Sequence, residues 1–140
     1  ARMVRPDIVF GADLIAGFPT ESDEMFANTL DLVSACGLTY LHVFPFSPRQ
    51  GTPAAKMPQV DRRAVKERAQ RLRQEGDAAL RAYLDTQRAR EAVILLERNN
   101  FGRTAQFAET DIDVAGMPGG MVRVRIIGND GRKLQAEVVS

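Results

Sequence analysis

Two charged side chains in this sequence have the type and placement that ligand binding requires. Asp13 is a carboxylate inside an apolar run, where an unpaired charge is costly, so it either faces a polar site or caps a neighbouring element. Arg49 follows the second apolar run in a loop framed by prolines, and its guanidinium suits bidentate binding of a carboxylate or a phosphate. His42, the single histidine, has no second ligand at a suggestive spacing, and we interpret it as structural.

Cys36 is the single cysteine of the chain, which limits the metal chemistry available to it. One thiol cannot form an internal disulfide, and this composition fits a reducing, cytoplasmic protein. A zinc or iron–sulfur site built from several cysteines of this chain is excluded as well, so we predict no metal ligands. The apolar context of Cys36 at the end of a predicted helix indicates a core position.

Composition and charge add further bounds. No apolar run approaches the roughly 20 residues needed to cross a bilayer, so the sequence does not indicate a membrane protein. The net charge is +1, but residues 59–90 contain nine Lys or Arg against five Asp or Glu. Such a basic run either faces a polyanion or is a solvated helix face, and the second interpretation is the commoner one.

The elements that must position Asp13 and Arg49 form a strand–helix–strand pattern. The apolar run 9–18 predicts a strand buried on both faces, and residues 20–24 offer an N-cap and an acidic first turn for the helix that follows. Gly37 ends that helix, and residues 38–46 predict a second strand parallel to the first. Two strands and one helix cannot cover both faces of a sheet, which indicates a piece of a larger α/β sheet or barrel.

The rest of the chain changes in character. Residues 61–88 predict one long amphipathic helix. Residues 92–96, 104–114, 121–127 and 134–139 read as short strands, and Gly128-Asn-Asp-Gly131 is a hairpin signal. Four or five such strands predict a small antiparallel barrel or sandwich.

The expected fold class is therefore α+β overall: a partial α/β barrel, a connector helix and a small all-β barrel. The expected domains are residues 1–58, a connector at 59–88, and residues 89–140.

Cations of the predicted barrel are candidate phosphate ligands. Arg123 and Arg125 share the strand face opposite Val122, Val124 and Ile126. Together with three further cations they predict an RNA-binding surface composed of Arg98, Arg103, Arg123, Arg125 and Lys133.

Phe101 and Phe107 either stack on bases beside these cations or belong to the core. The alternative for the cations is an ordinary polar strand face. Glu109, Asp111 and Asp113 would repel RNA if they shared that face, so we expect binding by this region to be weak and salt-sensitive.

Two passages resemble a known family. Gly11-Ala-Asp-Leu-Ile-Ala-Gly-Phe-Pro-Thr-Glu21 and Leu41-His-Val-Phe-Pro-Phe-Ser-Pro-Arg-Gln-Gly-Thr-Pro-Ala-Ala55 resemble the fifth and sixth strand regions of radical S-adenosylmethionine methylthiotransferases. The all-β tail resembles the TRAM domain that ends these enzymes. Within it, Gly102-Arg-Thr-Ala-Gln-Phe-Ala108 is close to the threonylcarbamoyladenosine tRNA enzymes.

The resemblance implies the C-terminal region of an enzyme that methylthiolates an adenosine beside the tRNA anticodon, with tRNA as partner. Such enzymes use S-adenosylmethionine and two 4Fe–4S clusters. The implied cofactor-binding residues are Asp13, Ile15, Gly17, Phe44 and Arg49, and the alternative for Ile15 and Gly17 is tight packing of a buried strand. Because the cluster cysteines are missing from this sequence, we expect no catalytic residue, no bound cofactor and no activity for this chain alone.

Alternative functions and assemblies remain open. One is a stand-alone RNA-binding module, which the proline-framed passage after residue 41 disfavours. Others are methylthiolation of isopentenyladenosine in tRNA or of a ribosomal protein. Because strands of a partial barrel leave unpaired edges, the chain could also form a dimer through them.

Overall fold

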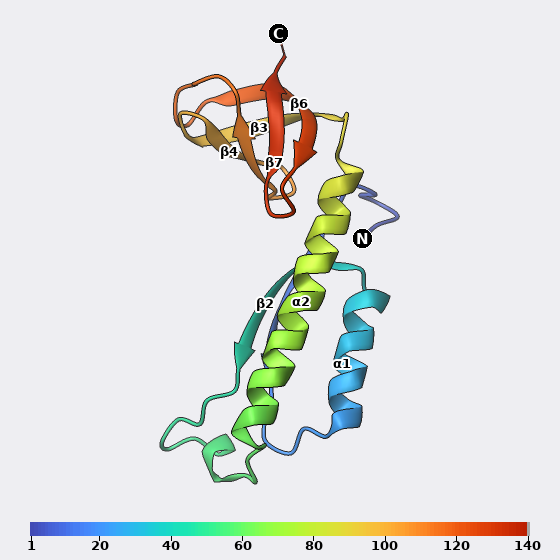
Figure 1. Cartoon of the computed structure of the whole chain (residues 1–140), viewed down its shortest axis with the longest axis vertical. Helices are drawn as coiled ribbons and strands as arrows, with labels where there is room; N and C mark the ends of the chain where they lie inside the picture. Colours follow the sequence, from blue (N-terminus) through green and yellow to red (C-terminus); the bar gives the residue numbers. More distant parts are fainter. Residues whose placement is uncertain (140) are drawn as a thin grey trace. The chain divides into compact units, whose positions relative to one another are not determined.

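The computed structural model describes residues 1–139 (Figure 1). Two compact units make up the chain: Val9–Ala79, called the sheet unit below, and Ala1–Ile8 with Leu80–Ser140, called the barrel unit. Among the described residues, no helix has both the length and the apolar character needed to cross a membrane.

The sheet unit begins with the predicted strand–helix–strand arrangement. β1 (Phe10–Ala16), α1 (Asp23–Ala35) and β2 (Leu38–Pro45) follow in order, and β1 and β2 pair in parallel as expected. The Ser22 hydroxyl accepts a hydrogen bond from the Met25 backbone N–H at 3.1 Å and so caps α1. Gly37, at φ +58°, lets the chain leave the helix in a left-handed conformation.

A single turn of 3₁₀ helix, η1 (Ala54–Lys56), precedes the long helix α2 (Arg62–Thr86), which contributes residues to both units. In the sheet unit, Ala69 and Leu72 of α2 pack in one core with Ala16, Val33 and Val43. The predicted amphipathic helix over residues 61–88 is therefore present as one continuous element.

The sheet unit covers one face of its two strands, which corrects the prediction of a strand buried on both faces. Along β1, exposed Gly11, Asp13 and Ile15 alternate with more buried residues. The core residues lie on the opposite face, where α1 and α2 pack. Among the described residues of the sheet unit, β1 and β2 are the only strands and both helices pack on the core side, so the other face of this two-stranded sheet is left open within the unit.

The barrel unit is a closed five-stranded barrel in the order β3-β4-β5-β7-β6. Its strands are β3 (Glu91–Arg98), β4 (Phe101–Thr104), β5 (Glu109–Ile112), β6 (Met121–Asn129) and β7 (Leu134–Val138). Ile94, Leu96, Val124, Ile126 and Leu134 fill the interior together with Leu84 of α2. The inward set of β6 is the one predicted from its alternation.

Two details of the barrel differ from the predictions. The barrel is not purely antiparallel, because β5 pairs with β7 in parallel. The expected single strand over 104–114 is interrupted by a turn, in which the Phe107 backbone N–H donates to the Thr104 carbonyl at 2.9 Å. Closure of five short strands demands these changes of direction, which residue alternation does not encode.

The hairpin between β6 and β7 lies where the Gly-Asn-Asp-Gly signal predicted it. The Asp130 carboxylate accepts hydrogen bonds from the backbone N–H groups of Lys133 and Arg132, both at 2.8 Å. These hydrogen bonds, with that from Lys133 foremost, hold the pKa of Asp130 below its usual value. Gly131 follows at φ +91°, which favours glycine.

Cys36 is exposed, which corrects its predicted place in the core. It is the C-cap of α1, and its backbone N–H donates to Leu32 O at 2.9 Å. The apolar stripe of the helix ends before this position, because the chain has begun to turn at Gly37.

Candidate functional site

The open face of the sheet unit gathers three of the predicted cofactor-binding residues. In the parallel register Asp13 lies opposite His42, and Ile15 lies opposite Phe44. Ile15 and Phe44 are 53% and 54% exposed, large values for apolar side chains on strands. The face therefore presents an aliphatic and an aromatic surface beside a carboxylate and an imidazole.

Gly17 does not share this face. A Cβ at this position would lie 2.5 Å from Val65 Cγ2 of α2, and the backbone has φ +77°. Both observations favour the packing interpretation of this glycine over cofactor contact. Its backbone N–H donates to Glu21 Oε1 at 3.1 Å.

Arg49 lies apart from both strands, in the exposed loop after β2. The structure gives it a local role through its backbone carbonyl, which accepts from the Thr52 hydroxyl at 2.7 Å and from the Thr52 N–H at 3.2 Å. Within residues 1–139, its guanidinium forms no hydrogen bond and no ion pair.

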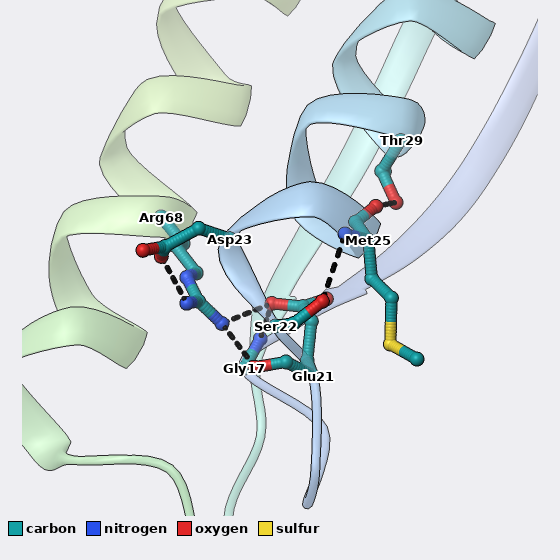
Figure 2. A network of polar contacts seen from close by, with 7 residues as sticks. All are labelled: Gly17, Glu21, Ser22, Asp23, Met25, Thr29 and Arg68. Carbon is teal, nitrogen blue, oxygen red and sulfur yellow. Dashed lines mark hydrogen bonds and ion pairs between the residues drawn. The ribbon is translucent and has the colours of Figure 1, made fainter.

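A buried ion pair fixes the turn at the carboxyl end of β1, as Figure 2 shows. The Arg68 guanidinium contacts Glu21 Oε1 at 2.8 Å and Asp23 Oδ1 at 2.7 Å, and it also donates to the Glu21 carbonyl at 3.0 Å. The side chains of Arg68 and Glu21 are only 10% and 12% exposed. Burial acts to lower the pKa of Arg68, but the hydrogen bonds that it donates to the Asp23 and Glu21 carboxylates, and the charges of these carboxylates, outweigh burial, so the pKa is raised overall.

Sequence reasoning missed Arg68 and a neighbouring aromatic pair. The rings of Phe18 and Phe46 pack edge to face just after the carboxyl ends of β1 and β2, with their centroids 5.3 Å apart. Arg68 is one of the nine Lys and Arg residues between positions 59 and 90, and nothing in the sequence distinguishes it as the buried one. Only its position over Phe26 and beside Glu21 distinguishes it.

The five predicted RNA-binding cations fall into three places on the outside of the barrel. Arg123 and Arg125 lie on β6, and their guanidinium groups are 3.9 and 3.2 Å from the Glu91 carboxylate, respectively. Both line a polar depression of about 600 Å³. Arg103 pairs with Glu97 at 2.8 Å and with Glu109 at 3.0 Å. Arg98 and Lys133 both lie over the ring of Phe101.

Carboxylates accompany each of these places. Arg125 also approaches Glu137 at 3.8 Å, and Lys133 approaches Asp111 at 3.9 Å. The side chains of these pairs are exposed or half-buried, so each pair contributes little to stability and is screened by salt. Glu109 and Asp111 therefore do share the outer surface with the predicted phosphate ligands.

Phe107 is 69% exposed, which excludes the core alternative for this residue. It stands at the turn between β4 and β5 with φ +66°, a conformation that is strained for a bulky residue. The Arg103 guanidinium lies over its ring at 5.9 Å from the centroid. The turn thus presents an aromatic face next to a planar cation.

Among residues 1–139, no group of three or more His, Cys, Asp or Glu side chains is arranged to hold a metal ion.

Known tRNA-modifying enzymes match nearly the whole chain, whereas no protein-family model matches it. The chain belongs to the MiaB/MtaB family of tRNA methylthiotransferases and matches a C-terminal region of these proteins. This result confirms the resemblance identified in the sequence. The closed small barrel is consistent with a TRAM-like domain.

Three relatives illustrate the match. The chain is 44% identical over 127 residues to the threonylcarbamoyladenosine tRNA methylthiotransferase MtaB of Rickettsia prowazekii, covering 91% of this chain and 30% of that protein. It is 34% identical over 144 residues to the tRNA-2-methylthio-N(6)-dimethylallyladenosine synthase of Ruegeria pomeroyi, covering 98% and 33%. The corresponding synthase of Zymomonas mobilis is 44% identical over 96 residues, covering 68% and 22%. The chain thus spans about a third or less of the length of these relatives.

Proposed function

We propose that this chain is the C-terminal region of an enzyme that methylthiolates N6-threonylcarbamoyladenosine beside the anticodon of tRNA, in the cytoplasm. The observation that carries the proposal is the 44% identity over 91% of the chain to a protein named for that reaction. Dimethylallyladenosine, the substrate named for the relative that matches 98% of the chain, is the second candidate.

The residues present fit one cofactor of the family and not the other. The open face offers Ile15 and Phe44 as apolar surfaces for a purine ring and Asp13 as an acceptor, which suits S-adenosylmethionine. When bound, that cofactor would supply the methyl group and the radical precursor. Gly17 and Arg49 lie off this face, so their assignment as cofactor ligands has less support.

The chain does not fit a 4Fe–4S cluster. Such clusters are held by several thiolates, and this chain contains Cys36 alone, at an exposed helix end. The role proposed for this region is therefore to contribute the open face to the S-adenosylmethionine site and to bind the tRNA.

A dimer remains a further proposal. It would form through the unpaired edges of β1 and β2, which pair only with each other among the described strands.

Substitution of Arg123 and Arg125 by Glu tests the proposed RNA-binding surface. The affinity of the 140-residue chain for a tRNA anticodon stem-loop, measured by fluorescence anisotropy, should fall at least about tenfold at low salt. The reason is that the double change removes two cations and adds two carboxylates beside Glu91, which together repel the RNA phosphates. The matched control is Lys56→Glu with Arg71→Glu, two exposed cations of the sheet unit. If the variant and the control bind equally well, the surface is wrongly assigned.

A further inference from the structure

A basic groove lies in the sheet unit, separate from the open sheet face. It measures about 1020 Å³ and is bounded by the loop after β2, including Phe46 and Ser47, and by the first three turns of α2. Four cations line it: Arg62, Arg63, Lys66 and Arg73. No carboxylate side chain is among its described lining residues, so the lining carries positive charge without negative charge.

The cations of the groove differ in how much of their charge is already compensated. Arg63 contacts the Glu67 carboxylate at 3.0 Å, but both side chains are largely exposed and this pair is weak. Arg73 donates to the Val43 carbonyl at 3.2 Å, which orients it without neutralising it. Arg62 and Lys66 form no ion pair within residues 1–139. Most of the positive charge is therefore available to a ligand.

The dimensions favour a chain of phosphates over a single anion. From residue 62 to residue 73, α2 rises by about 16 Å at about 1.5 Å per residue. Phosphates of one nucleic-acid strand follow one another along the duplex axis at about 3.4 Å, so this length spans several of them. Val65, Ala69 and Phe46 provide an apolar floor, and Phe46 adds an aromatic surface that suits a sugar or a base.

We infer that this groove binds the phosphodiester backbone of the RNA substrate, giving the enzyme a second RNA contact outside the barrel unit. The inference rests on the proposed function, because it assumes that RNA is the substrate. It also gives a role to the basic run at residues 59–90, for which the sequence favoured a solvated helix face.

The lysines of this chain make a direct footprint possible. There are three: Lys66 in the groove, Lys133 on the barrel, and Lys56, which lines neither surface. The 140-residue chain is acetylated with and without an anticodon stem-loop, and modification of each lysine is measured by mass spectrometry. We expect the RNA to slow acetylation of Lys66 several-fold and to leave Lys56 unchanged.

A salt titration supplies a second, independent measure. Arg62→Gln with Lys66→Gln should reduce the slope of log affinity against log salt by about two relative to the control Lys56→Gln with Arg71→Gln, because each phosphate contact contributes about 0.9. All four positions are exposed, and equal melting temperatures would show that both variants keep the fold.

Any one of four outcomes would overturn the inference. Protection of Lys133 without Lys66 removes the groove but leaves the proposed RNA-binding barrel intact. Equal protection of Lys66 by inorganic phosphate at the same phosphate concentration indicates a small-anion site instead. An unchanged salt slope in the groove variant also rejects it. If neither lysine is protected and no binding occurs at low salt, both the inference and the proposed RNA contact fail.

Discussion

Replacing Arg68 by Met should lower the free energy of unfolding of the sheet unit by about 3 to 5 kcal/mol, the range for breaking a buried ion pair. The loss comes mainly from Glu21, whose carboxylate is only 12% exposed and would be left without its cation. Asp23 is fully exposed and water replaces its partner at little cost. Glu21 also accepts from the Gly17 N–H, so the turn at the end of β1 should loosen at the same time.

The control is Arg63→Met on the same helix. Arg63 has a similar contact with Glu67, but the two side chains are 87% and 65% exposed, so the expected loss is no more than about 0.5 kcal/mol. Urea unfolding followed by circular dichroism gives the free energies, and amide hydrogen exchange assigns the loss to residues 9–79. Combining Arg68→Met with Glu21→Gln should recover about 1 to 3 kcal/mol of the summed losses. Equal losses for the Arg68 and Arg63 variants would refute the buried pair.

Substituting Gly102 by Ala should destabilise the barrel unit by at least about 3 kcal/mol. A Cβ at this position would lie 2.3 Å from the Leu95 carbonyl oxygen and 2.9 Å from its carbon. These are backbone atoms of the neighbouring strand, so no side chain can move aside to relieve the overlap. The register of β3 against β4 must shift, and barrel closure depends on that pair.

Gly128 is the matched control in the same barrel. Its Cβ would have a single neighbour at 3.7 Å, the amide oxygen of Gln135, which is ordinary contact. Gly128→Ala should therefore change stability by less than about 1 kcal/mol, in either direction. The measurement is the thermal unfolding of each variant with hydrogen exchange at β3 and β4. A Gly102 variant as stable as the Gly128 variant would show that the two strands are not so closely apposed.

The sequence predicted the elements well because their signals are local. The cap at Ser22, the stop at Gly37 and the alternation of Val122, Val124 and Ile126 each depend on neighbouring residues. Long-range arrangement was predicted less well. The parallel pairing of β5 with β7 and the exposure of Cys36 follow from how the chain closes on itself.

The candidate sites show the same division. Alternation on β1 and β2 is enough to place Asp13, Ile15 and Phe44 on one face once their strands pair in parallel. For Gly17 the local pattern left cofactor contact and tight packing open, because the neighbour that favours packing, Val65, lies far along the chain. Arg68 and the groove cations all belong to one basic helix, and only packing separates the buried arginine from those that line the groove.

A chimera tests the central claim most directly. The region of the Rickettsia prowazekii enzyme that matches this chain is replaced by this chain, and the chimera is produced in cells that lack their own enzyme. We predict that nucleoside mass spectrometry of the tRNA will detect 2-methylthio-N6-threonylcarbamoyladenosine. A chimera that contains as much iron and sulfide as its parent yet methylthiolates neither threonylcarbamoyladenosine nor dimethylallyladenosine would contradict the proposed function.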